Sequence, residues 1–167
     1  MTRLHPTIAL GVVALLSALL PAAAQQQPVA SPAPAPGSPG LYVTADELAQ
    51  QLDAAIAKGS DPATASIGVT DQYAIHEVHR GKSGPAAVHP GWTELHFILD
   101  GSATFVTGGT MTPGRAATIE GGVSRKVKKG DAIIVPPNTP HWYSQVDDSM
   151  TYLEVRFIAP GSPPPSK

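Results

Sequence analysis

Residues 89–101 read His-Pro-Gly-Trp-Thr-Glu-Leu-His-Phe-Ile-Leu-Asp-Gly, a strand pattern that carries three possible metal ligands. Side chains alternate faces along a strand, so Glu94, His96 and Ile98 point one way and the apolar residues between them point the other. His89 lies in the loop that precedes this strand. Imidazole nitrogens and carboxylate oxygens both bind transition metals, so this stretch predicts one wall of a metal site.

A second stretch, residues 130–143, reads Gly-Asp-Ala-Ile-Ile-Val-Pro-Pro-Asn-Thr-Pro-His-Trp-Tyr. It predicts a strand, a tight proline-rich turn and a further strand that begins at His141. Asn138 suits such a turn because asparagine tolerates the left-handed backbone conformation. The alternation places His141, Tyr143 and Gln145 on one face of the second strand.

Together the two stretches resemble the two sequence motifs of the cupins, over residues 73–158. In the first motif, His89, Glu94 and Gly101 match, and Ala87 stands where the family has its first histidine. In the second motif, Gly130, Pro136 and His141 match the glycine, the proline and the histidine. Asn138 replaces the second glycine, and Gln145 replaces the final asparagine.

The resemblance implies an all-β fold, a double-stranded β-helix or jelly-roll barrel, with a divalent metal in its mouth. Carried over residue by residue, it makes His89, Glu94 and His141 metal ligands. His96 could replace the missing first histidine because it faces the same way as Glu94; His79 and His76, on the strand predicted at 73–79, are rivals. Nitrogen and oxygen donors suit iron, manganese, nickel, copper or zinc alike.

Three polar or aromatic side chains beside these ligands could contact a small organic ligand: Trp92, Tyr143 and Gln145. Each could equally pack the barrel. The sequence leaves two function classes open, a small metalloenzyme acting on a small polar substrate by oxygenation, isomerisation, lyase chemistry or hydrolysis, and a non-catalytic module that binds or senses a small molecule. The His89, Glu94 and His141 set, with the open coordination position that it implies, indicates the enzyme, which is slightly preferred. The missing first histidine and the absence of an obvious further acid-base pair near the mouth indicate the module.

The remaining pattern predicts one helix followed by many short antiparallel strands. Thr44 and Glu47 form a capping box, and an apolar stripe over 44–58 predicts a helix that packs on the outside of the domain and contributes to its core. Turn residues separate the predicted strands. These strands cover 66–70, 73–79, 86–89, 93–99, 103–107, 116–119, 123–128, 132–135, 141–146 and 150–158.

The chain ends lie outside the predicted barrel (65–159) and the helical segment before it (41–64). Residues 1–24 have a basic start, a short apolar run and small residues before Gln25, as in a secretory signal peptide; an uncleaved anchor is the alternative. Residues 25–40 are rich in proline and alanine and predict a mobile linker, and 160–167 a loose tail. The expected location is therefore the periplasm or the outside of the cell, without stable membrane insertion once the signal is removed.

Composition excludes some chemistry and some partners. The chain has no cysteine, so disulfides and thiolate ligands are excluded. Without Arg3, ten Lys and Arg residues (11 − 1) face 13 Asp and Glu residues, which gives no electrostatic reason to expect nucleic acid as a partner. The basic run 125–129 is expected to be a solvated sheet face, with an anion-binding patch as the alternative. A homodimer is expected from the resemblance alone.

Overall fold

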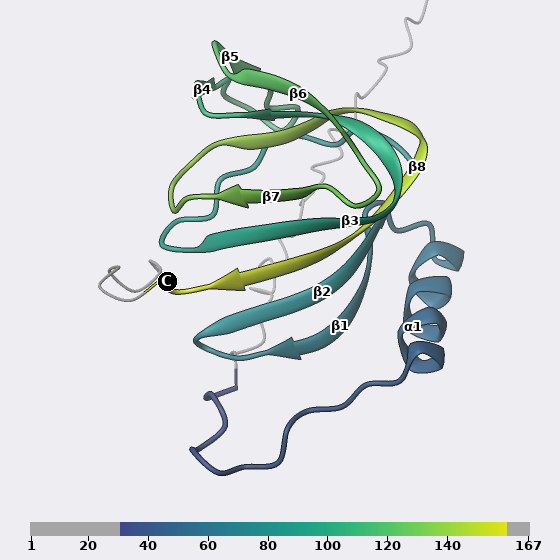
Figure 1. Ribbon diagram of the computed structural model, residues 1–167. Helices are drawn as coiled ribbons and strands as arrows, with labels where there is room; N and C mark the ends of the chain where they lie inside the picture. The colour runs from purple at the N-terminus through teal and green to yellow at the C-terminus, as the bar shows by residue number, and fades with distance from the viewer. Residues whose placement is uncertain (1–30, 160–167) are drawn as a thin grey trace, which may run out of the picture.

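Two long strands, β3 (Thr93–Thr107) and β8 (His141–Phe157), run antiparallel through the centre of the fold. Figure 1 shows the computed structural model, in which residues 31–159 are described. The expected signal peptide, the first part of the expected linker and the expected tail from residue 160 lie outside the described residues. The all-β architecture with one helix is the predicted jelly-roll barrel.

The sequence pattern predicts two shorter strands in place of each long one, and this prediction is wrong. The Asp100-Gly101 pair does not end β3; the register with β8 shifts on either side of it, and the strand bends and continues. Gly101 has φ +76°, and a Cβ at this position would clash with the backbone carbonyl oxygen of Ser149. Glycine therefore permits a bulge here, where the sequence pattern indicated a turn.

The other strands pair on both sides of this central pair, in the order β1-β2-β8-β3-β6, and β7 also pairs with β3. β1 (Ala63–Val69) and β2 (Tyr73–Arg80) form a hairpin beside β8, and β6 (Val123–Lys128) and β7 (Ala132–Val135) pair with successive parts of β3. A separate pair joins β4 (Thr110–Met111) to β5 (Ile119–Glu120). The ribbon therefore curls around one interior, which opens at one end (Figure 1).

Two predicted strands differ from the structure. Residues 86–89 form no strand; Ala87 makes only an isolated bridge to His141. Of residues 116–119, only the last belongs to a strand, the short β5. Both segments pair too little to form longer strands, since Ala87 has a single bridge and β5 has a two-residue pairing with β4. The basic run of β6 is exposed except for Val127, as expected for a solvated face.

The helix α1 (Ala45–Ala57) begins at the predicted capping box, in which Thr44 and Glu47 bond each other's backbone amides. It lies against the outer side of β1 (Figure 1). No residue of α1 is buried, so the expected contribution to the core is wrong. The core lies inside the barrel instead, and on β3 and β8 it contains Ile98, Ala103, Phe105, Tyr143, Met150 and Tyr152.

A second bulge, at Ser144, redirects the side chains of β8. Phe105 is opposite Tyr143, but its neighbour Thr104 is opposite Gln145, so Ser144 is an extra residue in β8. Gln145 consequently points outward, is exposed, and donates a hydrogen bond to Asp147. Hydrogen bonding from Lys126, then from Ser102, holds the pKa of Asp147 below its usual value.

Candidate metal centre

Three predicted ligands, His89, Glu94 and His141, converge at the open end of the barrel. Glu94 is almost fully buried on the inner face of β3, with 1% of its surface exposed. Its Oε1 accepts a hydrogen bond from His89 Nδ1 at 2.8 Å and lies 3.7 Å from His141 Nε2. The chain therefore brings together two imidazoles and one carboxylate from segments about fifty residues apart.

Backbone contacts hold His141 in place. His141 Nδ1 lies 3.1 Å from the Thr139 carbonyl oxygen, which can only accept, so Nδ1 donates and Nε2 is left facing Glu94. The backbone of His141 also exchanges two 2.9 Å hydrogen bonds with Ala87. Burial lowers the pKa of His141, against the charge of Glu94, and thereby favours the neutral imidazole that binds metals.

The loop that carries His89 is tied to the proline-rich turn before His141. Asn138 adopts the predicted left-handed conformation, with φ 61°, and its Oδ1 accepts a hydrogen bond from the Gly91 amide at 3.3 Å. This one side chain links the loops that lead into the two halves of the site. The turn chemistry seen in the sequence is therefore also a positioning device for His89.

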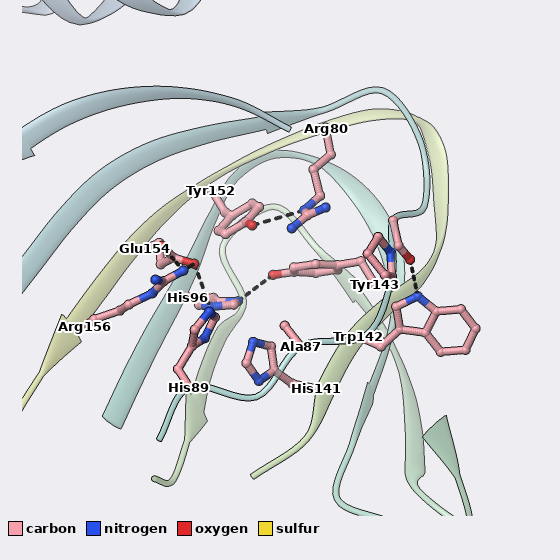
Figure 2. Close-up of a pocket in the computed structure, with 12 residues that line it drawn as sticks. Arg80, Ala87, His89, His96, His141, Trp142, Tyr143, Tyr152, Glu154 and Arg156 are labelled. Atoms are coloured by element: carbon pink, nitrogen blue, oxygen red, sulfur yellow. Dashed lines mark hydrogen bonds and ion pairs between the residues drawn. The ribbon is translucent and has the colours of Figure 1, made fainter. Parts of the chain in front are cut away.

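His96 joins a second cluster that shares Glu94 with the first. Its Nε2 lies 3.5 Å from Glu94 Oε2 and 3.6 Å from Glu154 Oε1, and all three residues are buried. Its Nδ1 lies 2.9 Å from the hydroxyl of Tyr143, which can donate or accept. Figure 2 shows the His96 ring between Tyr143 and Glu154, and the structure groups His96 with Glu94 and Glu154, beside the cluster that contains His89.

The other two histidines considered for the missing ligand lie elsewhere. His79 is on the outer face of β2, where its Nδ1 is 3.1 Å from Thr151 Oγ1. His76 faces inward, but its Nδ1 lies 3.2 Å from Ser66 Oγ. Neither belongs to a metal-binding cluster among residues 31–159.

Arg156 contacts both carboxylates of the second cluster. Its Nη2 lies 2.9 Å from Glu154 Oε2, and its Nε lies 3.4 Å from Glu94 Oε2. Burial opposes the ionisation of Glu94, but the hydrogen bond from His89, the contact with His96 and the charge of His141 outweigh it. They hold the pKa of Glu94 well below its usual value.

Three buried polar atoms of this cluster have no hydrogen-bond partner: Glu94 Oε2, His96 Nε2 and Arg156 Nε. Ligands about 2.0–2.2 Å from one ion, at angles of about 90–110°, lie roughly 2.8–3.6 Å apart. The separations around Glu94, from 2.8 to 3.7 Å, are close to that range. Glu94 Oε2 and His96 Nε2 are possible ligand atoms, whereas Arg156 Nε can only donate. The imidazole and carboxylate donors therefore fit a divalent transition metal.

The three histidines of the clusters and Glu154 line a small pocket with a free volume of about 50 Å³. Tyr143 lines it, as predicted for a ligand contact, whereas Gln145 points to solvent and Trp92 is not among the lining residues. The indole in the wall belongs to Trp142, whose Nε1 donates a 2.6 Å hydrogen bond to the Gly84 carbonyl oxygen. Ala87, where a histidine would complete the first motif, is also part of the wall.

The pocket residues that were not predicted include five with large polar or aromatic side chains: Arg80, Trp142, Tyr152, Glu154 and Arg156. Alternation along the strand predicted at 150–158 could have found three of them, because it places Glu154 and Arg156 on the same face as the buried Met150 and Tyr152. The expected absence of a further acid-base pair near the mouth is wrong, because His96 and Glu154 lie there together.

Burial raises the pKa of Tyr152 to about 12, against the charge of Arg80, so its phenol stays protonated.

Residues 74–156 match the family model for a cupin domain. None of the curated proteins matches this chain. Within the described residues, no helix combines the length and the apolar character required to span a membrane.

Solved structures that are similar to this chain have low identity to it. A candidate mannose-6-phosphate isomerase from Ralstonia eutropha is 16% identical, with a TM-score of 0.46, 59% of this chain covered and 86% of the other. The Cnp3 cupin domain of Schizosaccharomyces pombe is 15% identical, with a TM-score of 0.46, 57% of this chain covered and 63% of the other. Oxalate decarboxylase from Bacillus subtilis is 20% identical, with a TM-score of 0.40, 53% of this chain covered and 22% of the other.

Proposed function

Because this chain belongs to the cupin family, we propose that it binds a divalent transition metal through His89, Glu94 and His141 and acts on a small polar molecule at that metal. The observation that supports this most directly is the convergence of the three side chains at the open end of the barrel, with Glu94 almost fully buried. A bound ion would supply Lewis-acid or redox chemistry and an exchangeable position for a ligand.

The residues around the ion would have separate roles. Thr139 fixes the tautomer of His141, and Arg156 fixes the orientation of the Glu94 carboxylate. His96 and Glu154 form a buried pair next to the ligands, where they could hold a proton or supply a further ligand. This pair favours a metalloenzyme of the oxygenase, isomerase or lyase type over passive binding.

The alternative is a non-catalytic module that binds or senses a small molecule. One observation favours it: Ala87 replaces the first motif histidine, so the three-residue cluster has one imidazole fewer than the family's site. A metal held by three ligands would be weaker and more easily lost. Export from the cytoplasm is part of either version and is supported only by the pattern of residues 1–24.

Elemental analysis of the purified protein tests the proposal. We expect close to one equivalent of metal in the wild type, a loss of at least tenfold in metal affinity in His141→Ala, and a wild-type value in His79→Ala. The last variant is the matched control because it removes a histidine from the outer face of the same sheet. His96→Ala tests whether His96 is a ligand, because a metal content equal to that of the wild type would exclude it.

Equal metal content in His141→Ala and the wild type would overturn the proposed site. Bound metal with no turnover of any small carboxylic, hydroxylated or phenolic substrate would favour the binding module. Mass spectrometry of the secreted protein would locate the first residue, and a mature start near Gln25 is expected. A mature protein that still carries Met1 would contradict export by a cleaved signal.

A further inference from the structure

Arg80, at the end of β2, carries a charge in the pocket wall that has no carboxylate partner. No Asp or Glu oxygen of residues 31–159 lies within 4.0 Å of its guanidinium nitrogens. Its Nε donates a 3.1 Å hydrogen bond to the Tyr152 hydroxyl, and its guanidinium carbon lies 5.5 Å from the centre of the Tyr143 ring. Figure 2 shows the side chain reaching into the pocket from the side opposite His89 and His141.

The second arginine of the pocket differs in this respect. Arg156 is paired with both Glu94 and Glu154, so its positive charge cancels the negative charge of one of these carboxylates. Adding a divalent cation to two carboxylates and two arginines leaves a net positive pocket. A partly desolvated guanidinium without a counter-charge is costly, and a bound anion removes that cost.

The position of Arg80 is also well defined. It is stacked against aromatic rings on one side, and on the other it lies close to Gly84, where an added Cβ would be 3.2 Å from Nη1. The Gly84 loop is in turn fixed by the hydrogen bond from Trp142. An arginine held in this way loses little conformational entropy on binding a ligand.

We propose that Arg80 binds the carboxylate of a small carboxylic acid, whose other end reaches the His89–Glu94–His141 cluster. The planar guanidinium matches a carboxylate with two parallel hydrogen bonds. The Tyr152 hydroxyl accepts from Arg80 and is free to donate its own proton to the same ligand. The small free volume, about 50 Å³, favours an acid of only a few non-hydrogen atoms.

The carboxylic acid is the ligand class of the proposed metal site, so it rests on the proposed function. The experiment distinguishes a failure of the Arg80 subsite from a failure of the metal site. The probes are glycolate, which has a carboxylate and a hydroxyl, and its neutral amide, glycolamide. Binding is measured by titration calorimetry on the purified full chain, once metal-loaded and once after chelation. The variants are Arg80→Gln and Arg80→Lys, and Arg125→Gln is the control because Arg125 lies exposed on β6.

We expect the wild type to bind glycolate at least tenfold more tightly than glycolamide, and Arg80→Gln to bind glycolate about 10- to 100-fold more weakly than the wild type. Arg80→Lys keeps the charge but loses the planar fork, so an intermediate value is expected. Arg125→Gln should bind as the wild type does. Metal content should be the same in all four proteins, and unchanged circular dichroism would show that each variant folds.

Glycolate binding that is unchanged in both Arg80 variants, or absent from both forms of the wild type, would overturn the inference. Tighter binding of inorganic phosphate than of glycolate would overturn the assignment to a carboxylate. Arg80-dependent glycolate binding to a protein that takes up no metal would support this subsite and refute the proposed metal site.

Discussion

Replacing Glu94 by glutamine should destabilise the metal-free protein by about 2–4 kcal/mol. The carboxylate accepts a 2.8 Å hydrogen bond from His89, and a charge-assisted hydrogen bond contributes about 1.5–3 kcal/mol. Its side chain is 1% exposed, so water cannot replace the lost charge. Arg156 keeps its 2.9 Å contact with Glu154, and therefore only part of the penalty for an unpaired buried charge is added.

Urea denaturation of chelator-treated protein, followed by circular dichroism, measures this difference. For a domain of this size, 2–4 kcal/mol corresponds to a fall in Tm of about 6–12 °C. The control is Asp100→Asn, which removes an exposed carboxylate 3.6 Å from Lys129 and should change the free energy of unfolding by less than about 1 kcal/mol. The double variant Glu94→Gln/Arg156→Gln should cost less than the sum of its single variants, because the two side chains interact.

An equal or greater stability of Glu94→Gln would refute the reasoning. It would mean that the desolvation of the buried carboxylate cancels its contacts in the metal-free protein. Metal addition gives a second comparison. At a concentration of 100 times Kd, an ion should stabilise the wild type by about 2.7 kcal/mol, and Glu94→Gln should gain clearly less because one ligand has lost its charge.

Three further perturbations test other parts of the structure. Tyr143→Phe removes the hydroxyl 2.9 Å from His96 Nδ1 and should cost about 1–3 kcal/mol in urea denaturation; an unchanged unfolding midpoint would show that this contact is not stabilising. Gly101→Ala should cost clearly more than Gly108→Ala, because both positions have positive φ but only Gly101 has backbone atoms in the way of a Cβ; equal Tm values would contradict the bulge described for β3. The pKa of Asp147 is lower in the folded than in the unfolded protein, so the unfolded state binds more protons on acidification, and the stabilisation present above pH 4 is lost as the pH falls. Asp147→Asn should therefore flatten the fall of unfolding free energy below pH 4, and an identical pH profile would contradict this assignment.

The order of the elements and their general type could be read from the sequence because they depend on local patterns. The strand patterns identified the strand that carries Glu94 and the strands before and after the turn that precedes His141, and the capping box at Thr44 identified the start of the helix. The left-handed Asn138 was likewise predicted from its own chemistry. Each of these features is decided by residues a few positions apart.

Features that depend on two distant segments needed the tertiary structure. The bulges at Gly101 and Ser144 arise from the pairing of β3 with β8, so the alternation that predicted an inward Gln145 could not detect the change of face. The partners of Glu94 are a further case. His89 lies near it in the chain, but Glu154 and Arg156 belong to a strand that approaches only when the barrel closes.

The sequence by itself determined the all-β fold, the helix start and the candidate ligands His89, Glu94 and His141, because strand periodicity, capping and motif spacing are properties of the chain. Only the tertiary structure decided that His96 faces Glu154, and that Arg80 lies in the pocket wall without a carboxylate partner among residues 31–159. Charge balance within a pocket is a sum over side chains from several strands. That sum exists only after β2, β3 and β8 have been brought side by side.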